Sequence, residues 1–289
     1  MIILTGAGGF IGSVVLGYLN SQRVTDIIIV DDLPYENQYK NLIGKQYNRL
    51  VSVDDIDLID ENITGVIHIG ANANTLEKNW SSIYATNVRS TRKWNVFCKQ
   101  RKIPFIFTSS ASVYGNGAGP MNQYAFSKLL SENEVEGVVL RLFNVYGPNE
   151  YHKGRMASTI LHWFNQIKET EEITIFENSK NYFRDFVWVE DIAKTIYHFM
   201  FENYQPGIYD LGSGSNTDFE TVADLVISNT NKGKKRFVDM PDDLKKQYQI
   251  NTLADMTLLT KSGVDVEGFT KVHEGIATYI DYLAKTRYY

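Results

Sequence analysis

Short apolar segments alternate with longer segments of helical periodicity along the first half of the chain. The apolar segments are rich in Ile, Val and Phe, and they have the length of strands that are buried on both faces of a sheet. Most are separated by a dozen or more residues, as crossover connections between parallel strands require. The pattern therefore predicts a parallel α/β sheet. The predicted strands are Ile2–Thr5, Ile27–Val30, Val66–Ile69, Phe105–Thr108 and Val138–Leu142.

The second half of the chain follows a less regular pattern. The alternation is interrupted after Gly147-Pro148. It returns with apolar runs at Asp185–Val189 and Ile208–Leu211, so we expect the chain to leave the sheet and rejoin it after an insertion. A short strand is predicted at Ile173–Phe176. The predicted helices are Trp80–Gln100, Ala157–Lys168, Ile192–Phe201, Phe219–Ile227 and Val272–Leu283.

Composition and charge exclude several classes of protein. With 289 residues, 43% hydrophobic and 22% charged, the chain can bury a substantial core, which excludes a disordered or fibrous protein. The net charge is −5 and no basic run exceeds the triplet Lys234-Lys235-Arg236, so no nucleic acid partner is expected. The single cysteine cannot form an intrachain disulfide or a thiolate metal site. With one cysteine, no bound metal is expected. No signal peptide or long apolar stretch is found, which favours a soluble, cytoplasmic protein without membrane contact.

A glycine-rich turn follows the first predicted strand. Gly6, Gly9 and Gly12 stand three residues apart, which allows a tight turn, close approach of backbone N–H groups to a pyrophosphate, and close packing of the next helix on the sheet. Asp31 and Asp32 end the second predicted strand, where a carboxylate can accept hydrogen bonds from an adenosine ribose. The combination predicts a Rossmann-type, dinucleotide-binding fold.

Asp31 favours NAD as the dinucleotide. A carboxylate at this place repels the 2′-phosphate of NADP unless a cation compensates, and no basic residue occurs between Asp31 and Lys40. Lys40 and Arg49 are close enough in sequence to reach a 2′-phosphate, so NADP stays open as the alternative.

A second motif supplies groups for proton transfer. The strand that begins at Phe105 runs into a cluster of serines that includes Ser110, and Tyr124 and Lys128 follow. On a helix, residues four apart share one face, so the Lys128 ammonium can lower the pKa of the Tyr124 phenol. Ser110 can donate a hydrogen bond to a substrate oxygen at the carboxyl end of the strand, where α/β sheets bind ligands.

These motifs resemble the extended short-chain dehydrogenases/reductases, which include nucleotide-sugar epimerases, dehydratases and reductases. The resemblance rests on the Thr-Gly-x-x-Gly-x-x-Gly turn, Asp31, Asn87, Ser110 and the Tyr-x-x-x-Lys pair. The dehydratases usually follow the active-site hydroxyl with Asp-Glu, whereas Ala111-Ser112 follow it here. An epimerase or a reductase is therefore the better match.

Within that superfamily the chain resembles the ADP-glycero-manno-heptose 6-epimerases over essentially its whole length. Residues 143–158 match the Phe-Asn-Val-Tyr-Gly-Pro-x-Glu-x-His-Lys-Gly-x-Met-Ala-Ser pattern, and residues 176–187 follow Phe-Glu-Gly-Ser…Asn…Arg-Asp-Phe-Val. The resemblance implies a redox-neutral inversion. C6 of the nucleotide-linked heptose loses a hydride to bound NAD⁺, and the resulting ketone turns and regains the hydride on its other face.

The resemblance also implies the roles of the site residues. Because the alcohol proton leaves in one orientation and returns in another, two acid/base groups are favoured, Tyr124 and Lys153. Lys128 would hold the nicotinamide ribose, and Ser110 would bond the reacting oxygen. The expected cofactor contacts are Gly6, Gly9, Phe10, Ile11, Gly12, Asp31, Asp32, Ile69, Gly70, Ala71, Asn87 and Lys128. The expected substrate contacts are Ser110, Asn144, Val145, Arg155, His162, Phe176, Glu177, Asn178, Ser179, Arg184 and Tyr248.

Three of these residues have a structural alternative. Lys153 can be a solvated charge on a loop. Arg184 can pair bidentately with a pyrophosphate or form an ordinary salt bridge with Asp185. His162 can be a packed helix residue instead of a ligand.

Two departures from the family leave the substrate open. Only residues 116–123 separate Tyr114-Gly115 from Tyr124, which is shorter than the family's loop, and Arg155 and Asn178 replace a serine and a glycine. The nucleotide and the sugar stereochemistry are therefore open. The alternatives are an epimerase or reductase for a UDP-, GDP- or dTDP-sugar and, from another class, a cofactor-binding sensor without turnover.

The predicted organisation is two interleaved lobes in a homo-oligomeric enzyme. No repeat, low-complexity tract or flexible linker divides the chain, which favours lobes that share it over domains in series. Residues 1–145 and 184–215 are expected to form the NAD-binding Rossmann domain, and residues 146–183 and 216–289 a smaller α/β lobe that binds the nucleotide sugar.

Overall fold

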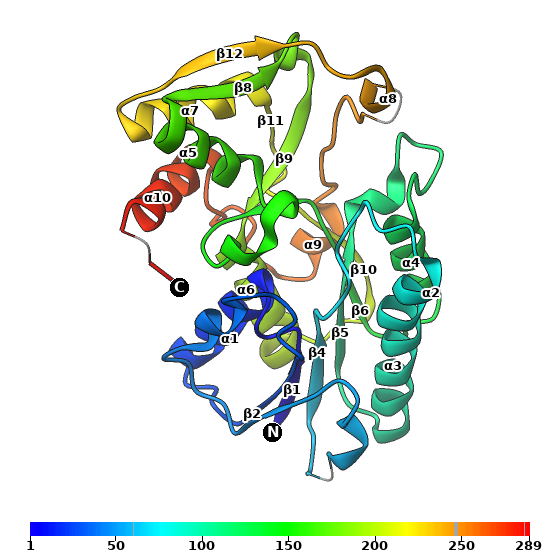
Figure 1. Ribbon diagram of the computed structural model, residues 1–289. Coiled ribbons are helices and arrows are strands. Elements are labelled where there is room, and N and C mark those ends of the chain that lie inside the picture. Colours follow the sequence, from blue (N-terminus) through cyan, green and yellow to red (C-terminus); the bar gives the residue numbers. More distant parts are fainter. Residues whose placement is uncertain (60, 246–247, 286) are drawn as a thin grey trace.

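Seven parallel strands form the central sheet, in the order β10-β6-β5-β4-β1-β2-β3 (Figure 1). The computed structural model describes residues 1–59, 61–245, 248–285 and 287–289. The strand order reverses beside β1, as in a doubly wound Rossmann-type sheet, so the predicted fold class is confirmed. The strands are β1 (Ile2–Thr5), β2 (Ile27–Val30), β3 (Arg49–Val51), β4 (Gly65–His68), β5 (Phe105–Ser110), β6 (Val138–Leu142) and β10 (Gly207–Leu211).

The five strands predicted from the apolar runs are all present. Every residue of β1, β2 and β4 is buried, which explains why these strands lack a polar face. Alternate residues pack on opposite sides of the sheet: Ile2 and Leu4 belong to one apolar cluster and Ile3 to another. β5 continues to Ser110, two residues beyond the predicted end. The extension places the serine hydroxyls at the carboxyl end of the strand.

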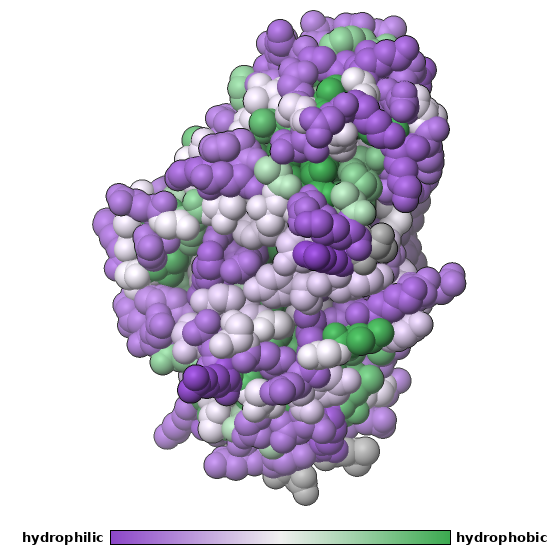
Figure 2. Space-filling view, turned by 90° about the vertical axis from the view of Figure 1, so that its left-hand side faces the viewer, coloured by the Kyte–Doolittle hydropathy of each residue, from purple (hydrophilic) through white to green (hydrophobic). Residues whose placement is uncertain are grey.

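Helices cover both faces of the sheet (Figure 1). α1 (Phe10–Ser21) packs against α6 (Val189–Tyr197) on one face, and α3 (Ser90–Arg101) and α4 (Gln123–Glu132) lie on the other. Figure 2 shows a mainly hydrophilic outer surface on one side, with apolar residues in small groups. Within the described residues, no helix is both long and apolar enough to cross a membrane.

The single helix predicted over residues 80–100 is divided into three parts. α2 (Trp80–Ile83) leads into a π-helical turn over Tyr84–Arg89, and α3 follows. Asn87 lies in the wider turn, where its amide accepts from the N–H of Asn72 at 2.8 Å and donates to the Asn72 carbonyl at 3.0 Å. π turns often occur at functional sites, and this one fixes the loop that follows β4.

A smaller lobe covers the carboxyl ends of the main strands. Two small sheets form it: β11 (Asn216–Asp218), β9 (Phe183–Trp188) and β7 (Asn144–Tyr146) in one, and β12 (Lys234–Val238) with β8 (Glu172–Phe176) in the other. Its helices start within two residues of the predicted positions, because their apolar faces pack on one cluster. They are α5 (Thr159–Thr170), α7 (Phe219–Thr230) and α10 (Val272–Ala284), accompanied by the short α8 (Asp242–Lys245) and α9 (Thr257–Lys261).

The return of the chain to the main sheet differs from the prediction. We expected the sheet to resume near Arg184, but β9 pairs with β7 and β11 in the smaller lobe. β10 is the strand that rejoins the sheet, beside β6. Five of the six residues of β9 are buried, so its apolar pattern is that of a core strand, and such a pattern does not indicate which sheet the strand joins.

The Asp185 carboxylate ties β9 to two distant segments. It is fully buried and accepts hydrogen bonds from the backbone N–H groups of Ser213 at 2.6 Å, Gly214 at 3.1 Å and Ala254 at 3.1 Å. Burial raises the pKa of Asp185, and these bonds to the ionised form oppose the rise. The carboxylate therefore fixes the turn after β10 against the smaller lobe.

Asp185→Ala removes the acceptor of three backbone N–H groups, of which that of Ala254 is buried, so we expect the free energy of unfolding to fall by about 3 kcal/mol. Urea denaturation measures this loss. The matched control is Asp224→Ala, which removes an exposed carboxylate paired with Lys235 and should cost less than about 1 kcal/mol. Equal, small losses in both variants would contradict the anchoring role of Asp185.

Candidate functional site

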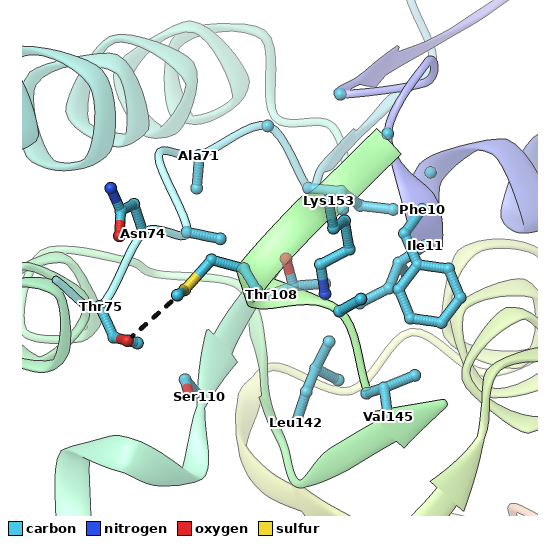
Figure 3. A pocket seen from close by; sticks show the side chains of 18 of the residues that line it. Phe10, Ile11, Ala71, Asn74, Thr75, Thr108, Ser110, Leu142, Val145 and Lys153 are labelled. Atoms are coloured by element: carbon cyan, nitrogen blue, oxygen red, sulfur yellow. Dashed lines mark hydrogen bonds between the residues drawn. The ribbon is translucent and has the colours of Figure 1, made fainter. Parts of the chain in front are cut away.

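A pocket of about 530 Å³ lies at the carboxyl ends of the central strands (Figure 3). Its lining comes from the glycine-rich turn, the ends of β4, β5 and β6, and the segment from β7 to α5. Doubly wound sheets bind ligands at this place, because the strand order reverses there and leaves a crevice. The pocket is therefore the candidate active site.

The glycine-rich turn leaves no room for side chains. Gly6 has a φ of +71°, and a Cβ atom there would lie 2.6 Å from the backbone nitrogen of Gly70. A Cβ atom at Gly12 would lie 2.0 Å from the carbonyl oxygen of Gly6. α1 begins at Phe10 without a side-chain cap, so its first N–H groups are available to an anion. These features fit the pyrophosphate of a dinucleotide.

Asp31 and Asp32 point to different places. Asp31 lines the pocket and accepts from the N–H groups of Gly8 and Leu33, both at 2.9 Å. Burial raises the pKa of Asp31, and the two backbone bonds oppose the rise. Asp32, in contrast, accepts from the Ser52 hydroxyl at 2.7 Å and does not line the pocket. Of the two predicted ribose contacts, the structure places only Asp31 at the pocket.

Tyr124 and Ser110, the residues predicted to take part in proton transfer, both line the pocket. Tyr124 lies on the first turn of α4, and burial raises its pKa while the Ser110 hydroxyl lowers it. We expected Lys128 to lower the pKa of Tyr124, and the structure gives the Lys128 ammonium a backbone partner. This ammonium donates to the Thr108 carbonyl at 2.8 Å, and burial lowers the pKa of Lys128 to about 7. The pKa of Tyr124 is therefore raised, where a lowering by Lys128 was expected.

Lys153 enters the pocket from the opposite lobe. It lies on a 3-10 turn over Tyr151–Met156, and its ammonium is 5.1 Å from the centre of the Phe10 ring. Figure 3 shows its side chain directed into the pocket beside Phe10. Burial lowers the pKa of Lys153, and Glu150 raises it. Lys153 is thus not a solvated loop charge, whereas Arg155, two residues later, is exposed.

The loop that carries Lys153 is bonded to the glycine-rich turn, which the sequence analysis did not predict. Asn41 donates to the carbonyl groups of Gly8 at 2.9 Å and Asn149 at 3.1 Å. The Asn149 side chain donates to the Ser13 hydroxyl of α1 at 2.9 Å. No local pattern marks Asn41, because it joins segments that are far apart in the sequence.

A second group of predicted residues lies in the smaller lobe around Arg184. The guanidinium is buried, 4.9 Å from the Tyr248 ring centre and 5.3 Å from that of Phe219. No carboxylate of the described residues pairs with it, and Asp185 is bonded elsewhere, so the salt-bridge alternative is wrong. The guanidinium donates to the Phe183 carbonyl at 2.8 Å, and among the described residues the buried Ser179 hydroxyl lacks a hydrogen-bond partner. An anion with further acceptors would satisfy both groups.

Asn178 shows how one departure from the family is tolerated. Its φ is +61°, in the left-handed region that glycine adopts freely. Asparagine enters this region more readily than other residues with a side chain, so it can replace the family's glycine without changing the turn.

The structure brings most of the predicted cofactor residues together and separates some of the others. Asn87 is bonded to Asn72 and to the Ser127 hydroxyl and does not line the pocket, and His162 is half-buried on α5. The predicted residues that line the pocket are Gly6, Gly9, Phe10, Ile11, Gly12, Asp31, Ile69, Gly70, Ala71, Ser110, Tyr124, Lys128, Asn144, Val145 and Lys153. Those outside its lining are Asp32, Asn87, Arg155, His162, Phe176, Glu177, Asn178, Ser179, Arg184 and Tyr248.

Fold and site together define a Rossmann-type, dinucleotide-dependent enzyme. The chain belongs to the NAD dependent epimerase/dehydratase family, whose model matches residues 2–212. It is 36% identical to the ADP-L-glycero-D-manno-heptose-6-epimerase of Brachyspira hyodysenteriae, over 99% of this chain and 98% of that protein. The predictions of an enzyme and of NAD as its cofactor are thereby confirmed.

Solved structures confirm the fold. The Helicobacter pylori ADP-L-glycero-D-manno-heptose-6-epimerase superposes with a TM-score of 0.85 at 23% identity, covering 98% of this chain and 96% of that one. The UDP-N-acetylglucosamine 4-epimerase of Methanobrevibacter ruminantium gives 0.85 at 22% identity, with 99% and 98% covered. The Bacillus cereus UDP-glucuronic acid 4-epimerase, solved with UDP-glucuronic acid and NAD, gives 0.83 at 21% identity, with 99% of both chains covered.

Gly12→Ala should abolish the retention of NAD, because the added methyl group collides with a backbone oxygen that cannot move alone. NAD released by denaturing the purified protein measures this loss. Gly17→Ala is the control on the same helix, since its Cβ atom meets only side-chain atoms, at 3.0 Å. A folded Gly12→Ala protein that retains NAD like the wild type would contradict the assignment of this turn.

Proposed function

We propose that this protein is an ADP-glycero-manno-heptose 6-epimerase, which inverts C6 of the nucleotide-linked heptose through a transient ketone. One observation carries the proposal: two different lobes bring Tyr124 and Lys153 into one pocket beside the glycine-rich turn. The relative that is 36% identical over nearly its whole length bears the name of this activity. NAD, when bound, supplies the hydride acceptor and donor.

Tyr124 and Lys153 are suited to opposite proton transfers. Burial raises the pKa of Tyr124 and lowers that of Lys153, so a neutral phenol faces a lysine that loses its proton more easily. An epimerase needs such a pair, because one group takes the alcohol proton and the other gives a proton to the turned ketone. In our proposal Lys153 takes the proton in one orientation and Tyr124 donates in the other, with Ser110 bonding the reacting oxygen.

The nucleotide part of the substrate is assigned to the smaller lobe. A buried guanidinium without a carboxylate partner, such as Arg184, favours a bound diphosphate. The Tyr248 ring, 6.4 Å from that of Phe176, offers an aromatic surface to a base. The proposed nucleotide contacts are Phe176, Glu177, Asn178, Ser179, Arg184 and Tyr248, with Asn144, Val145, Arg155 and His162 nearer the sugar.

The proposal includes the expected organisation of the enzyme. We assign NAD to residues 1–145 and 184–215 and the nucleotide sugar to residues 146–183 and 216–289, although β9 pairs within the smaller lobe. A homo-oligomer in the cytoplasm is also proposed, on the sequence resemblance, and sedimentation velocity measures the oligomeric state.

An epimerase or reductase for another nucleotide sugar is the second candidate. The short 116–123 loop favours it, because this loop connects the strand end that carries Ser110 to the helix that carries Tyr124. Gln249 of the smaller lobe donates to the Gly115 carbonyl, just before the loop. Consumption of added NADH in proportion to product would select the reductase.

The purified, NAD-loaded protein should invert C6 of ADP-D-glycero-D-manno-heptose without net consumption of NADH. NMR of the C6 configuration follows the reaction. A folded protein that leaves this compound unchanged but inverts a UDP-sugar would contradict the proposed substrate.

Tyr124→Phe and Lys153→Met should each lower kcat by about 10²- to 10⁴-fold with little change in KM, because each removes one proton-transfer group and keeps the size of the side chain. Initial-rate kinetics measure both effects. Lys168→Met, at an exposed lysine of α5, is the control and should keep the wild-type rate. Wild-type activity of Lys153→Met would exclude the role of Lys153.

A further inference from the structure

Glu150 is a fully buried carboxylate beside the candidate site. It accepts from the N–H and the hydroxyl of Ser158, both at 2.5 Å, and from the Tyr279 hydroxyl at 3.0 Å. These bonds link the Lys153 loop to the start of α5 and to α10. Structural hydrogen bonds of this kind do not require a charged acceptor, and burying a charge is costly.

Glu150 has no ion pair within 4.0 Å among the described residues. Lys153 lies three residues later in the same loop, and its backbone N–H donates to the Glu150 carbonyl at 3.0 Å. Burial raises the pKa of Glu150 and lowers that of Lys153, and the attraction between the two side chains opposes both shifts. The two charges are thus coupled through a low-dielectric interior without touching.

Both charges are held in place. Asn149, next to Glu150, is bonded to Ser13 of α1. Ser158, the main donor to Glu150, also caps α5 by accepting from the N–H of Leu161 at 3.3 Å. Lys153 lies over the Phe10 ring. A carboxylate held in place near a group that becomes a cation during a reaction stabilises that cation. The aspartate of a serine-protease triad does this for its histidine.

We propose that Glu150 is a positioning residue that stabilises the ammonium formed when Lys153 takes the substrate proton. This inference rests on the proposed function. In the first half-reaction the alcohol proton moves to Lys153 Nζ as C6 gives up its hydride, which bound NAD would accept and later return. In the second half-reaction C6 regains the hydride on its other face and Tyr124 gives its proton to the new alkoxide. The proton held by Lys153 then passes through solvent to the Tyr124 phenolate, which restores both groups for the next turnover. Glu150 exchanges no proton and balances the charge on Lys153 between these steps.

Other charged groups near Lys153 do not replace Glu150. Burial lowers the pKa of the neighbouring His152 to about 4, so this ring is uncharged at neutral pH. Tyr35 lines the same pocket, as do Lys128 and Tyr124, and neither a protonated Lys128 nor a neutral Tyr124 adds negative charge there. Asp31 also lines the pocket, but the turn beside it uses both of its oxygens.

Glu150→Gln tests the proposal, because it keeps the size of the side chain and one acceptor oxygen and removes the charge, although an NH₂ group replaces the other oxygen. The rate at which acetic anhydride acetylates Lys153, followed by peptide mass spectrometry across pH, reports the ionisation of this lysine without any need for activity. We expect the midpoint to fall by about one pH unit or more, which corresponds to about tenfold faster acetylation at a fixed pH below the midpoint. The acid limb of the pH profile of kcat should also move to lower pH, with little change in KM.

Two further variants separate charge from structure. Tyr279→Phe removes one hydrogen bond to Glu150 but keeps the charge, so the Lys153 midpoint should stay in place. Glu150→Asp moves the charge by one methylene and should give a smaller fall, and it provides the measurement if Glu150→Gln does not fold.

An unchanged midpoint in folded Glu150→Gln would overturn the proposal, as would an equal shift in Tyr279→Phe. If Glu150→Gln does not fold, an unchanged midpoint in Glu150→Asp would overturn it. A shifted midpoint in a chain whose wild type does not epimerise would contradict the proposed function instead, and leave the coupling of Glu150 to Lys153 intact.

Discussion

The bond network between the glycine-rich turn and the Lys153 loop sets the geometry of the whole site. Asn41 joins Gly8 to Asn149, and Asn149 is bonded in turn to α1. These contacts fix the loop of the second lobe against the element that recognises the dinucleotide. The position of Lys153 over Phe10 follows from them, and so does the shape of the pocket between the lobes.

The proposed reaction needs two proton-transfer groups on different sides of the substrate, and two lobes supply them. A ketone that turns in the site must meet a proton-transfer group in each orientation, and one helix cannot supply both. α4 brings Tyr124 from the Rossmann sheet, and the loop after β7 brings Lys153 from above it. Burial then moves the two pKa values in opposite directions, because desolvation disfavours the phenolate of Tyr124 and the ammonium of Lys153.

Local sequence patterns predicted the helices and strands. Which sheet a strand joins and which distant side chains meet depend on tertiary contacts. β1 is apolar throughout and is followed by three glycines, so both its burial and the turn after it could be predicted from neighbouring residues. The membership of β9 in the smaller sheet depends on which edge it meets, and the role of Asn41 depends on a contact with Asn149, 108 residues away. The raised pKa of Tyr124 was missed because desolvation depends on the complete fold.

The central claim is that one pocket removes a hydride from C6 and returns it to the same molecule. Epimerisation of C6-deuterated substrate mixed with unlabelled substrate carrying a second isotope elsewhere tests this claim most directly. The account predicts that the inverted product keeps its deuterium at C6, with no transfer to the other labelled molecules and none to water. Loss of deuterium to water, or its appearance in the other molecules, would contradict it.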